Sequence, residues 1–369
     1  MYKTKQRLYA DLNVFLITVA MLLVIGGIFV YSASSVYALE NFHSSYYYLK
    51  RQLIGLLVGF IGIIVVQCIP LRRIQDYAPF LFFGSLGITA LTLISSLSSN
   101  IHGSSRWLSI FRFSFQPSEL LKIGLVIYVA YFLDHRKQVT RTALGQYVPL
   151  LVAIGLSSLI LLRQPDFGLT ITLLLTVLVM LFVAQVQLKH IFIALGALVP
   201  IVIGLILVRP YRLKRIMTFI NPWKDPQGSG FQIIQSLIAI GSGGFTGLGI
   251  GQSKQKFFYL PMQHTDFIFS IIAEEGGFIG VLFLITLLIS FCYLGLRIAT
   301  QLPNRFTALC TLGFVSLISL QSLINICVAT GLLPTKGIGL PFVSYGNSAL
   351  VCSLAMVGLI ISFVRNAEH

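Results

Sequence analysis

Acidic and basic side chains gather near the ends of apolar segments in this chain. The carboxylates are Glu119, Asp166, Asp266, Glu274 and Glu275. The basic residues on the same predicted face are Arg106, Arg163, Arg212, Arg215 and Lys336. Ionisable groups close to hydrocarbon are costly and tend to face a cavity or a partner. Cations beside carboxylates at a membrane surface suit a substrate with phosphate on a lipid tail, where the cations hold the phosphate and one carboxylate acts as a base.

Asp266 is the carboxylate of most interest, because it stands where the longest polar stretch of the chain meets the next apolar segment. A base at this position would face a substrate at the membrane surface. The competing interpretation is structural, since aspartate is a favoured N-cap of a helix. The residues alone leave both interpretations open.

The other candidates also have structural interpretations. Glu274 and Glu275 lie about two helical turns deeper, where an interhelical hydrogen bond is a simpler role than chemistry. Arg163 and Asp166 are close enough in sequence to form an ion pair with each other. Trp107 is typical of an interfacial anchor.

Three further features need no catalytic role. Lys336 stands in a glycine- and proline-rich stretch and would by default be a solvated charge. The glycines at 241–244 lack the Lys-Ser/Thr ending of a phosphate-binding P-loop. The tyrosines at 46–48 are typical of an aromatic belt at a membrane interface.

The elements that must position these groups are membrane-spanning helices. Hydrophobic residues make up 56% of the chain and charged residues 10%, and a soluble domain carries about 25% charged residues. We therefore predict an all-α, polytopic membrane protein with a single transmembrane domain over 1–369 and a long extracytoplasmic loop over about 209–265. The predicted spans are 12–34, 49–69, 78–98, 117–134, 146–162, 168–186, 190–208, 266–296, 306–329 and 347–364.

The net charge of +15 fits a membrane better than a nucleic acid, because the charges lie in short segments between spans. Such charges suit anionic lipid headgroups and topology control. An even number of spans puts both termini on one side. With the termini inside, the short inner loops hold more lysine and arginine than the short outer loops, which predicts cytoplasmic termini. The five cysteines, which have no metal-ligand spacing, read as packing residues.

Short motifs along nearly the whole chain resemble those of the SEDS family of shape, elongation, division and sporulation proteins. The motifs are Tyr48-Leu49-Lys50-Arg51-Gln52, Arg106-Trp107, Phe115-Gln116-Pro117-Ser118-Glu119, Gln164-Pro165-Asp166, Asn221-Pro222-Trp223, Asp225-Pro226-Gln227-Gly228, Gln235-Ser236, His264-Thr265-Asp266-Phe267-Ile268-Phe269 and Pro341-Phe342-Val343-Ser344-Tyr345-Gly346. Their order on ten spans is specific, although each motif alone is weak. The segment Pro334-Thr335-Lys336-Gly337 favours the division and sporulation branches over the elongation branch. Asn347 departs from the family pattern, where a second glycine is usual.

The resemblance implies a peptidoglycan glycosyltransferase that polymerises lipid II at the outer face of the cytoplasmic membrane during cell division. It implies that Asp266 is the catalytic base, which takes a proton from the acceptor hydroxyl while pyrophosphate leaves with inversion at the donor sugar. We expect substrate binding by the polar and aromatic residues Arg106, Trp107, Glu119, Arg163, Asp166, Arg212, Arg215, Gln235, His264, Lys336 and Ser344. It implies no organic cofactor and leaves open a divalent cation, Mg²⁺ or Mn²⁺.

The resemblance also implies partners and a location. The partners are lipid II, a class B penicillin-binding protein that acts as transpeptidase, other divisome proteins and membrane lipids, and no nucleic acid. The location is the bacterial cytoplasmic membrane at the division septum. Two other functions fit the same sequence, a lipid II flippase and a scaffold for the penicillin-binding protein. Transporters tend to place charges on broken helices near the midplane, whereas most charges here lie at the predicted outer face.

Overall fold

The computed structural model describes residues 2–94, 98–101, 104–110, 113–135, 147–187, 189, 196, 204, 215, 217–228, 230–256, 260–261, 263–335 and 337–367. The helices in these parts are α1 (Tyr2–Phe42), α2 (Tyr47–Gln67), α3 (Leu71–Asp76), α4 (Ala78–Leu91), α5 (Pro117–His135), α6 (Val148–Arg163), α7 (Phe167–Val183), α10 (Phe231–Ser242), α11 (Ile268–Gln301), α12 (Arg305–Ala329) and α13 (Asn347–Asn366). A short 3₁₀ helix, η2, covers Pro222–Lys224.

Most of the predicted spans correspond closely to these helices, but the predicted span 12–34 was too short, because α1 runs from Tyr2 to Phe42. Five of the described helices, α1, α2, α11, α12 and α13, are long and apolar enough to cross a membrane, and α4, α6 and α7 are shorter apolar helices. The predicted span 78–98 was too long, because α4 ends at Leu91. The predicted span 190–208 lies almost entirely outside the described residues. The fold is the predicted all-α polytopic bundle.

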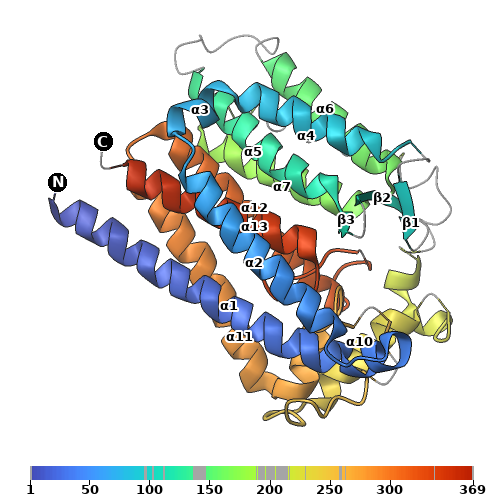
Figure 1. The fold of residues 1–369 in the computed structure, drawn as a ribbon. Coiled ribbons are helices and arrows are strands. Elements are labelled where there is room, and N and C mark those ends of the chain that lie inside the picture. The colour runs from blue at the N-terminus through green and yellow to red at the C-terminus, as the bar shows by residue number, and fades with distance from the viewer. Residues whose placement is uncertain are drawn as a thin grey trace.

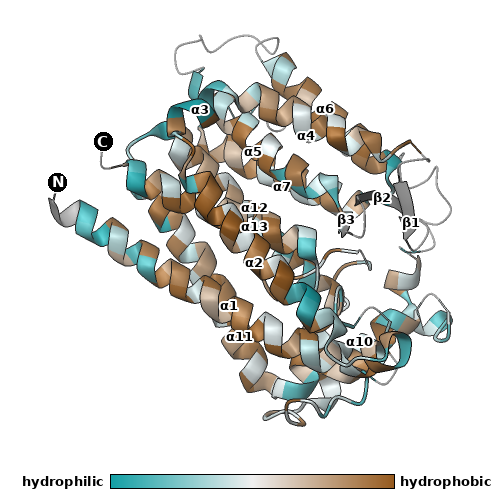
Figure 2. Cartoon of the chain, viewed as in Figure 1, coloured by the Kyte–Doolittle hydropathy of each residue, from teal (hydrophilic) through white to brown (hydrophobic). Residues whose placement is uncertain are grey.

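The bundle is organised around α12, which packs against α5, α7, α11 and α13. Its apolar residues are buried almost all around, as expected for a central helix. By contrast, α2 and α4 keep many large apolar side chains exposed, as helices that face lipid do. Figure 2 shows hydrophobic residues along the helices and hydrophilic residues gathered toward the two ends of the bundle.

Helices α2 and α13 are held together by small residues. A side-chain carbon at Gly59 would lie 2.3 Å from Cδ1 of Leu354, and one at Gly358 would lie 3.0 Å from Cα of Ile63. Gly55 faces Asn347 in the same way, at 3.0 Å. Glycines spaced four apart let two helices approach closely in a membrane. We call this contact the α2–α13 seam.

A small antiparallel sheet follows α4, and the sequence analysis missed it. Its strands are β1 (Ser98–Ile101), β2 (Ser104–Ile110) and β3 (Phe113–Phe115), in the order β1-β2-β3. The register pairs Ser99 with Trp107 and Leu108 with Phe115. Figure 1 places the sheet at the end of the bundle opposite to α3 and the two termini. Both termini thus lie at one end, as the even number of spans predicted.

The long loop predicted over 209–265 contains the helix α10, which packs against α11 and α12. Its buried residues Ile233, Ile234 and Ala239 form one apolar face. Ser236 also joins α10 to its neighbours, since its Oγ lies 2.6 Å from Ser270 Oγ and donates at 2.6 Å to the carbonyl of Ala329. This part of the loop is therefore built into the bundle.

Helix α11 is broken at Gly277, where φ is 62° and ψ is −162°. The segment 243–249 runs against the break and supplies the hydrogen bonds that the helix loses there. Leu248 N and Gly249 N donate to the carbonyls of Glu274 and Glu275, each at 3.0 Å, and Phe278 N donates to Gly244 O at 3.0 Å. Broken helices are tolerated at membrane depth only where protein satisfies the freed backbone groups.

Candidate active site

A cavity of about 910 Å³ opens at the end of the bundle that carries β1–β3. Its walls come from the α1–α2 corner, from β2, from the starts of α5 and α7, and from the loops before α11 and α13. The predicted site residues that line it are Arg106, Trp107, Glu119, Asp166, Arg215, His264, Asp266 and Ser344. The fold therefore brings together residues that lie more than two hundred positions apart.

Asp266 lies in the cavity just before α11 and does not cap that helix. The N-cap is Phe267, and it makes no side-chain capping bond. The amide of Asn325 holds the chain in place, because its Nδ2 donates to Asp266 O at 2.8 Å and to Ile338 O at 2.7 Å. Among the residues that the structure describes, none hydrogen-bonds to the Asp266 carboxylate. The structural alternative, in which Asp266 caps the helix, is therefore wrong.

Burial raises the pKa of Asp266 from its ordinary value of 3.8 to about 7. Asp166 adds to the rise, whereas the positive charges of Arg106 and Arg215 oppose it. Burial raises the pKa of a carboxyl because it disfavours the charged form. A pKa near the working pH is what general base catalysis needs, since the group is then both ionised and basic.

Arg106 and Asp166 form one rigid unit at the side of the cavity. Arg106 donates from Nε to Gln164 O at 3.0 Å, and its Nη1 lies 3.6 Å from Asp166 Oδ2. Asp166 also caps α7, because its Oδ1 accepts from Leu169 N at 3.1 Å. The expected alternative, an ion pair of Asp166 with Arg163, is wrong. Arg163 is exposed and does not line the cavity.

Two further charged residues are fixed by protein partners. Arg215 donates from Nη1 to Thr335 O at 2.9 Å, which joins this arginine to the loop before α13. Glu119 forms a buried ion pair with Lys122, at 2.5 Å from Oε2 to Nζ, and Lys122 also donates to Gln321 Oε1 at 3.2 Å. Glu119 therefore reaches the cavity as half of an ion pair.

His264 and Ser344 shape the cavity next to Asp266. Burial lowers the pKa of His264 to about 4, so its ring is neutral at physiological pH. The ring lies 4.4 Å from that of Tyr48, measured between centroids. Ser344 Oγ donates to Thr265 O at 2.6 Å and accepts from Leu340 N at 2.7 Å. Ser344 thus joins the loop before α13 to the residue that precedes Asp266.

Three other predicted site residues are not placed at the cavity. Gln235 lies on α10 and does not line it. Arg212 and Lys336 lie outside the described residues. The sequence analysis also missed Tyr47, Tyr48 and Arg51 as wall residues. The family motif from Tyr48 to Gln52 could have indicated these residues, but the tyrosines were interpreted as an aromatic belt.

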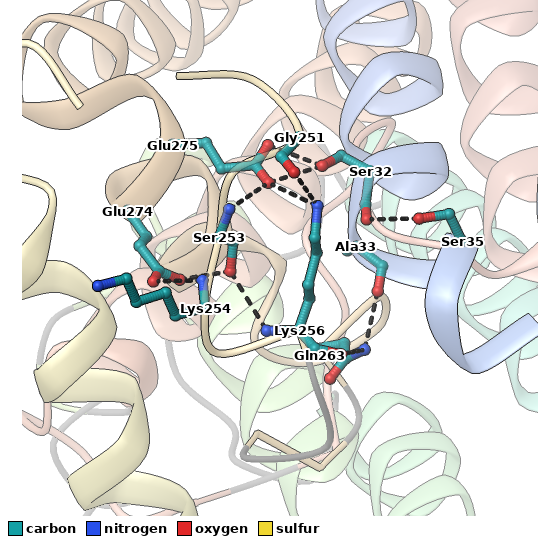
Figure 3. A network of polar contacts seen from close by, with 10 residues as sticks. All are labelled: Ser32, Ala33, Ser35, Gly251, Ser253, Lys254, Lys256, Gln263, Glu274 and Glu275. Carbon is teal, nitrogen blue, oxygen red and sulfur yellow. Dashed lines mark hydrogen bonds and ion pairs between the residues drawn. The ribbon is translucent and has the colours of Figure 1, made fainter. Parts of the chain in front are cut away.

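Glu274 and Glu275 belong to a buried polar network that does not line the cavity (Figure 3). Ser32 Oγ donates to both Glu275 oxygens, at 2.7 and 2.8 Å, and Lys256 Nζ lies 3.7 Å from Glu275 Oε1. Glu274 accepts from Ser253 Oγ and, at 2.9 Å, from the backbone N of Lys254. The expectation of an interhelical hydrogen bond is confirmed for Glu275, because Ser32 lies on α1 and Glu275 on α11. It is wrong for Glu274, which bonds to the non-helical segment at Ser253 and Lys254. The network fixes the segment that leads into His264 and Asp266.

No cluster of three or more His, Cys, Asp or Glu side chains suited to a metal ion occurs in the described parts of the chain. The described cysteines are all free.

Fold and site together define a class, a polytopic helical membrane protein with a buried carboxylate and arginines in a cavity at one end of its bundle. Residues 13–369 match the model of the cell cycle proteins FtsW, RodA and SpoVE, and the chain belongs to this family. The resemblance inferred from the motifs is thereby confirmed.

Relatives and solved structures agree with this family. The chain is 43% identical over 349 residues to the probable peptidoglycan glycosyltransferase FtsW of Trichlorobacter lovleyi, covering 95% of this chain and 92% of the relative. It is 40% identical over 367 residues to the stage V sporulation protein E of Bacillus subtilis, covering 99% and 100%. A chain from a structure of a peptidoglycan synthase complex, described as coordinating polymerization and crosslinking, matches with TM-score 0.80, 30% identity and coverage of 96% and 98%. The rod shape determining protein RodA of Thermus thermophilus matches with TM-score 0.72, 27% identity and coverage of 96% and 97%.

Proposed function

We propose that this protein joins lipid II molecules into glycan strands at the outer face of the cytoplasmic membrane, with Asp266 as the general base. Its family and its relatives make it a peptidoglycan glycosyltransferase. The observation that carries the proposed role is the Asp266 carboxylate, which lies in a 910 Å³ cavity beside two arginines and has its pKa raised to about 7.

In the proposed step, Asp266 takes the proton from the GlcNAc 4-hydroxyl of the acceptor. The oxygen attacks the MurNAc anomeric carbon of the donor, the bond from that carbon to the pyrophosphate oxygen breaks, and the configuration inverts. Undecaprenyl pyrophosphate leaves with the electron pair, and Asp266 then releases its proton to solvent. Because pyrophosphate is a good leaving group, no second acid is needed, unlike the carboxylate pair of a glycosidase.

Base catalysis contributes only about 10²–10⁴-fold, so positioning and charge stabilisation must supply the rest. Arg106 and Arg215 are the positive charges that act on Asp266. They would stabilise the negative charge that develops on the departing pyrophosphate. The carboxylates of Asp166 and Asp266 do not make a cation site by themselves, because Asp166 already caps α7 and pairs with Arg106. In the proposed step, the two arginines rather than Mg²⁺ or Mn²⁺ supply the positive charge.

We also propose that the enzyme works with a class B penicillin-binding protein and other divisome proteins, at the septum, with both termini in the cytoplasm. A structural match to a complex that coordinates polymerization with crosslinking supports the first partner, because crosslinking is the reaction of a transpeptidase. Both termini lie at the same end of the bundle, which supports placing them on the same side of the membrane.

The test is glycan-strand formation from purified lipid II by the protein with its cognate transpeptidase, as wild type and as Asp266→Asn. The asparagine keeps the size of the side chain and removes the base. The matched control is Asp76→Asn at the end of α3, where the side chain is exposed. Polymer from wild type and Asp76→Asn, with none from a folded, partner-bound Asp266→Asn, supports the proposal.

Two results would contradict it. Equal polymer from wild type and Asp266→Asn would remove the base role from Asp266. No polymer from an intact wild-type complex would favour a lipid II flippase, which translocation of lipid II across liposomes would then test.

A further inference from the structure

The cavity has a second wall whose residues the proposed step does not use. Phe42 at the end of α1 and Tyr47, Tyr48 and Arg51 at the start of α2 line it, together with Tyr345. The ring of Phe42 stacks on Tyr47 at 3.8 Å between centroids, and Tyr48 meets Tyr345 edge to face at 4.9 Å. We call these five residues the aromatic wall.

Arg51 is the cation of the aromatic wall. Its guanidinium lies 4.7 Å from the centroid of the Tyr47 ring, and its positive charge opposes the rise that burial causes in the pKa of Tyr345. In the parts of the chain that the structure describes, no carboxylate lies within ion-pair distance of Arg51. The residue is exposed, so most of its donors face the cavity or solvent. A guanidinium fixed on an aromatic ring is well suited to bind a phosphate group.

The other two arginines of the cavity differ from Arg51. Arg106 donates to two backbone carbonyls and pairs with Asp166, and Arg215 donates to Thr335 O. Both of them act on the charge of Asp266, whereas Arg51 acts on Tyr345. The cavity therefore holds two cationic regions, one around the base and one at the aromatic wall. His264 connects them, because it precedes Asp266 by two residues and its ring lies 4.4 Å from that of Tyr48 between centroids.

The chemistry of the proposed reaction fixes where two pyrophosphates must lie, and the present inference rests on that reaction. The donor pyrophosphate leaves the carbon under attack, so it lies at the reacting centre beside Asp266. The acceptor hydroxyl is on the sugar farther from the acceptor's own pyrophosphate. When that hydroxyl is at Asp266, the acceptor pyrophosphate lies the length of a disaccharide away.

We propose that Arg51 and the aromatic wall bind the pyrophosphate and adjacent sugar of the acceptor, while Arg106 and Arg215 serve the pyrophosphate of the donor. The guanidinium supplies paired donors to phosphate oxygens. The tyrosine rings supply apolar faces and hydroxyl groups for the sugar. The acceptor pyrophosphate stays intact through the step, so this region has to bind it and does not have to stabilise a leaving group.

The test uses two probes with the complex of the protein and its transpeptidase. The donor-only probe is lipid II whose GlcNAc 4-hydroxyl is blocked by galactose. The acceptor-only probe is lipid II with a CH₂ group in place of the anomeric oxygen, so that its pyrophosphate cannot leave. The rate of coupling is measured while one probe is varied and the other is held in excess.

Arg51→Ala is expected to raise KM for the acceptor-only probe by about tenfold or more, the loss typical of a hydrogen bond to a charged group. KM for the donor-only probe should change by less than about twofold. Arg51→Lys keeps the charge and should fall between wild type and Arg51→Ala. The matched control is Lys50→Ala, because Lys50 is exposed on the same turn and does not line the cavity.

An equal rise in KM for both probes, or no rise for either, would overturn the assignment. The coupling is repeated in vesicles of phosphatidylcholine with and without phosphatidylglycerol. An effect of Arg51→Ala confined to the anionic vesicles would assign Arg51 to lipid headgroups and would also overturn it. No product from wild type would contradict the proposed reaction itself. Direct binding of the acceptor-only probe to wild type and Arg51→Ala would still decide what Arg51 binds.

Discussion

Oδ2 of Asp266 and Nη1 of Arg106 face the same point in the cavity, above Gly337. A side-chain carbon at Gly337 would lie 3.6 Å from the first atom and 3.8 Å from the second. The proposed base and one of the proposed phosphate-binding cations therefore flank a space that glycine leaves open. A reacting sugar placed there would be within reach of both groups.

Larger residues at Gly337 should block this space in a graded way. Gly337→Ala makes contacts at ordinary distances and should keep most activity. Gly337→Leu should lower kcat/KM by about tenfold or more, because small displacements of a substrate from its reactive geometry are costly. The check is the rate of lipid II polymerisation beside thermal unfolding, and a Gly337→Leu protein as active as Gly337→Ala would contradict the placement of the substrate.

The rate of polymerisation should rise with pH and level off above about 7, because Asp266 acts only as the carboxylate and its pKa is raised to about 7. The measurement is kcat/KM between about pH 5 and 9. A rate that is already level at pH 5 would show that the base has an ordinary carboxyl pKa.

Stability gives an independent view of the same group. The folded state binds the Asp266 proton more tightly than the unfolded state. Proton binding by Asp266 therefore stabilises the folded state in full below the ordinary pKa of 3.8. This stabilisation is lost as pH rises through about 7. Asp266→Asn should remove this pH-dependent contribution, which thermal unfolding across the same range would reveal.

The buried pair of Glu275 and Lys256 should show strong coupling. Glu275→Gln removes the negative charge that faces the buried ammonium of Lys256, which costs about 3 kcal/mol of unfolding free energy. Lys256→Met should lower the unfolding free energy by a similar amount, because it leaves the buried carboxylate without the positive charge of Lys256. The double variant should lose clearly less unfolding free energy than the sum of the two single losses. Unfolding in detergent measures all three, and strict additivity would mean that the two charges do not stabilise each other.

The control for that cycle is the ion pair of Arg297 with Asp11, at 2.9 Å, in which Arg297 is partly exposed. There, Asp11→Asn and Arg297→Met should give a smaller coupling energy than the Glu275–Lys256 pair, because water reaches Arg297 although Asp11 is buried.

The break in α11 predicts that two adjacent glycines respond differently to alanine. Gly277 has φ of 62°, and a side-chain carbon there would lie 2.2 Å from Gly247 N. Gly277→Ala should therefore lower the unfolding free energy by about 2 kcal/mol or more. Gly276 has open space around it, so Gly276→Ala should be neutral or stabilise the helix by up to about 1 kcal/mol. Equal melting temperatures for the two variants would contradict the break.

Hydrophobic runs in the sequence were sufficient to predict most of the bundle. Segments of about twenty apolar residues have few folding choices in a membrane. The helix α10 escaped prediction because its twelve residues are too few to span a membrane and because its apolar face is stabilised by α11 and α12. The sheet β1–β3 was not predicted, because its serine-rich strands show little hydrophobic pattern.

The site was predicted in part. Asp266 and Arg106 were identified from their residue types and from motifs. Which carboxylate pairs with which cation depends on tertiary contacts. The pairing of Asp166 with Arg106 rather than Arg163 joins the N-cap of α7 to β2, and nothing local in the sequence indicates it. The aromatic wall was misinterpreted for the same reason, since a tyrosine run in sequence does not reveal whether it faces lipid or a cavity.

The α2–α13 seam limits where a prenyl tail can run. Leu350 on α13 and Ile54 on α2 both line the cavity, and the seam just beyond them is closed at Gly59, where even one added carbon would meet Leu354. A hydrocarbon chain attached to a substrate in the cavity cannot pass between these two helices. The tail must reach the bilayer through another side of the cavity. The seam therefore limits the directions from which a substrate can present its sugars to Asp266.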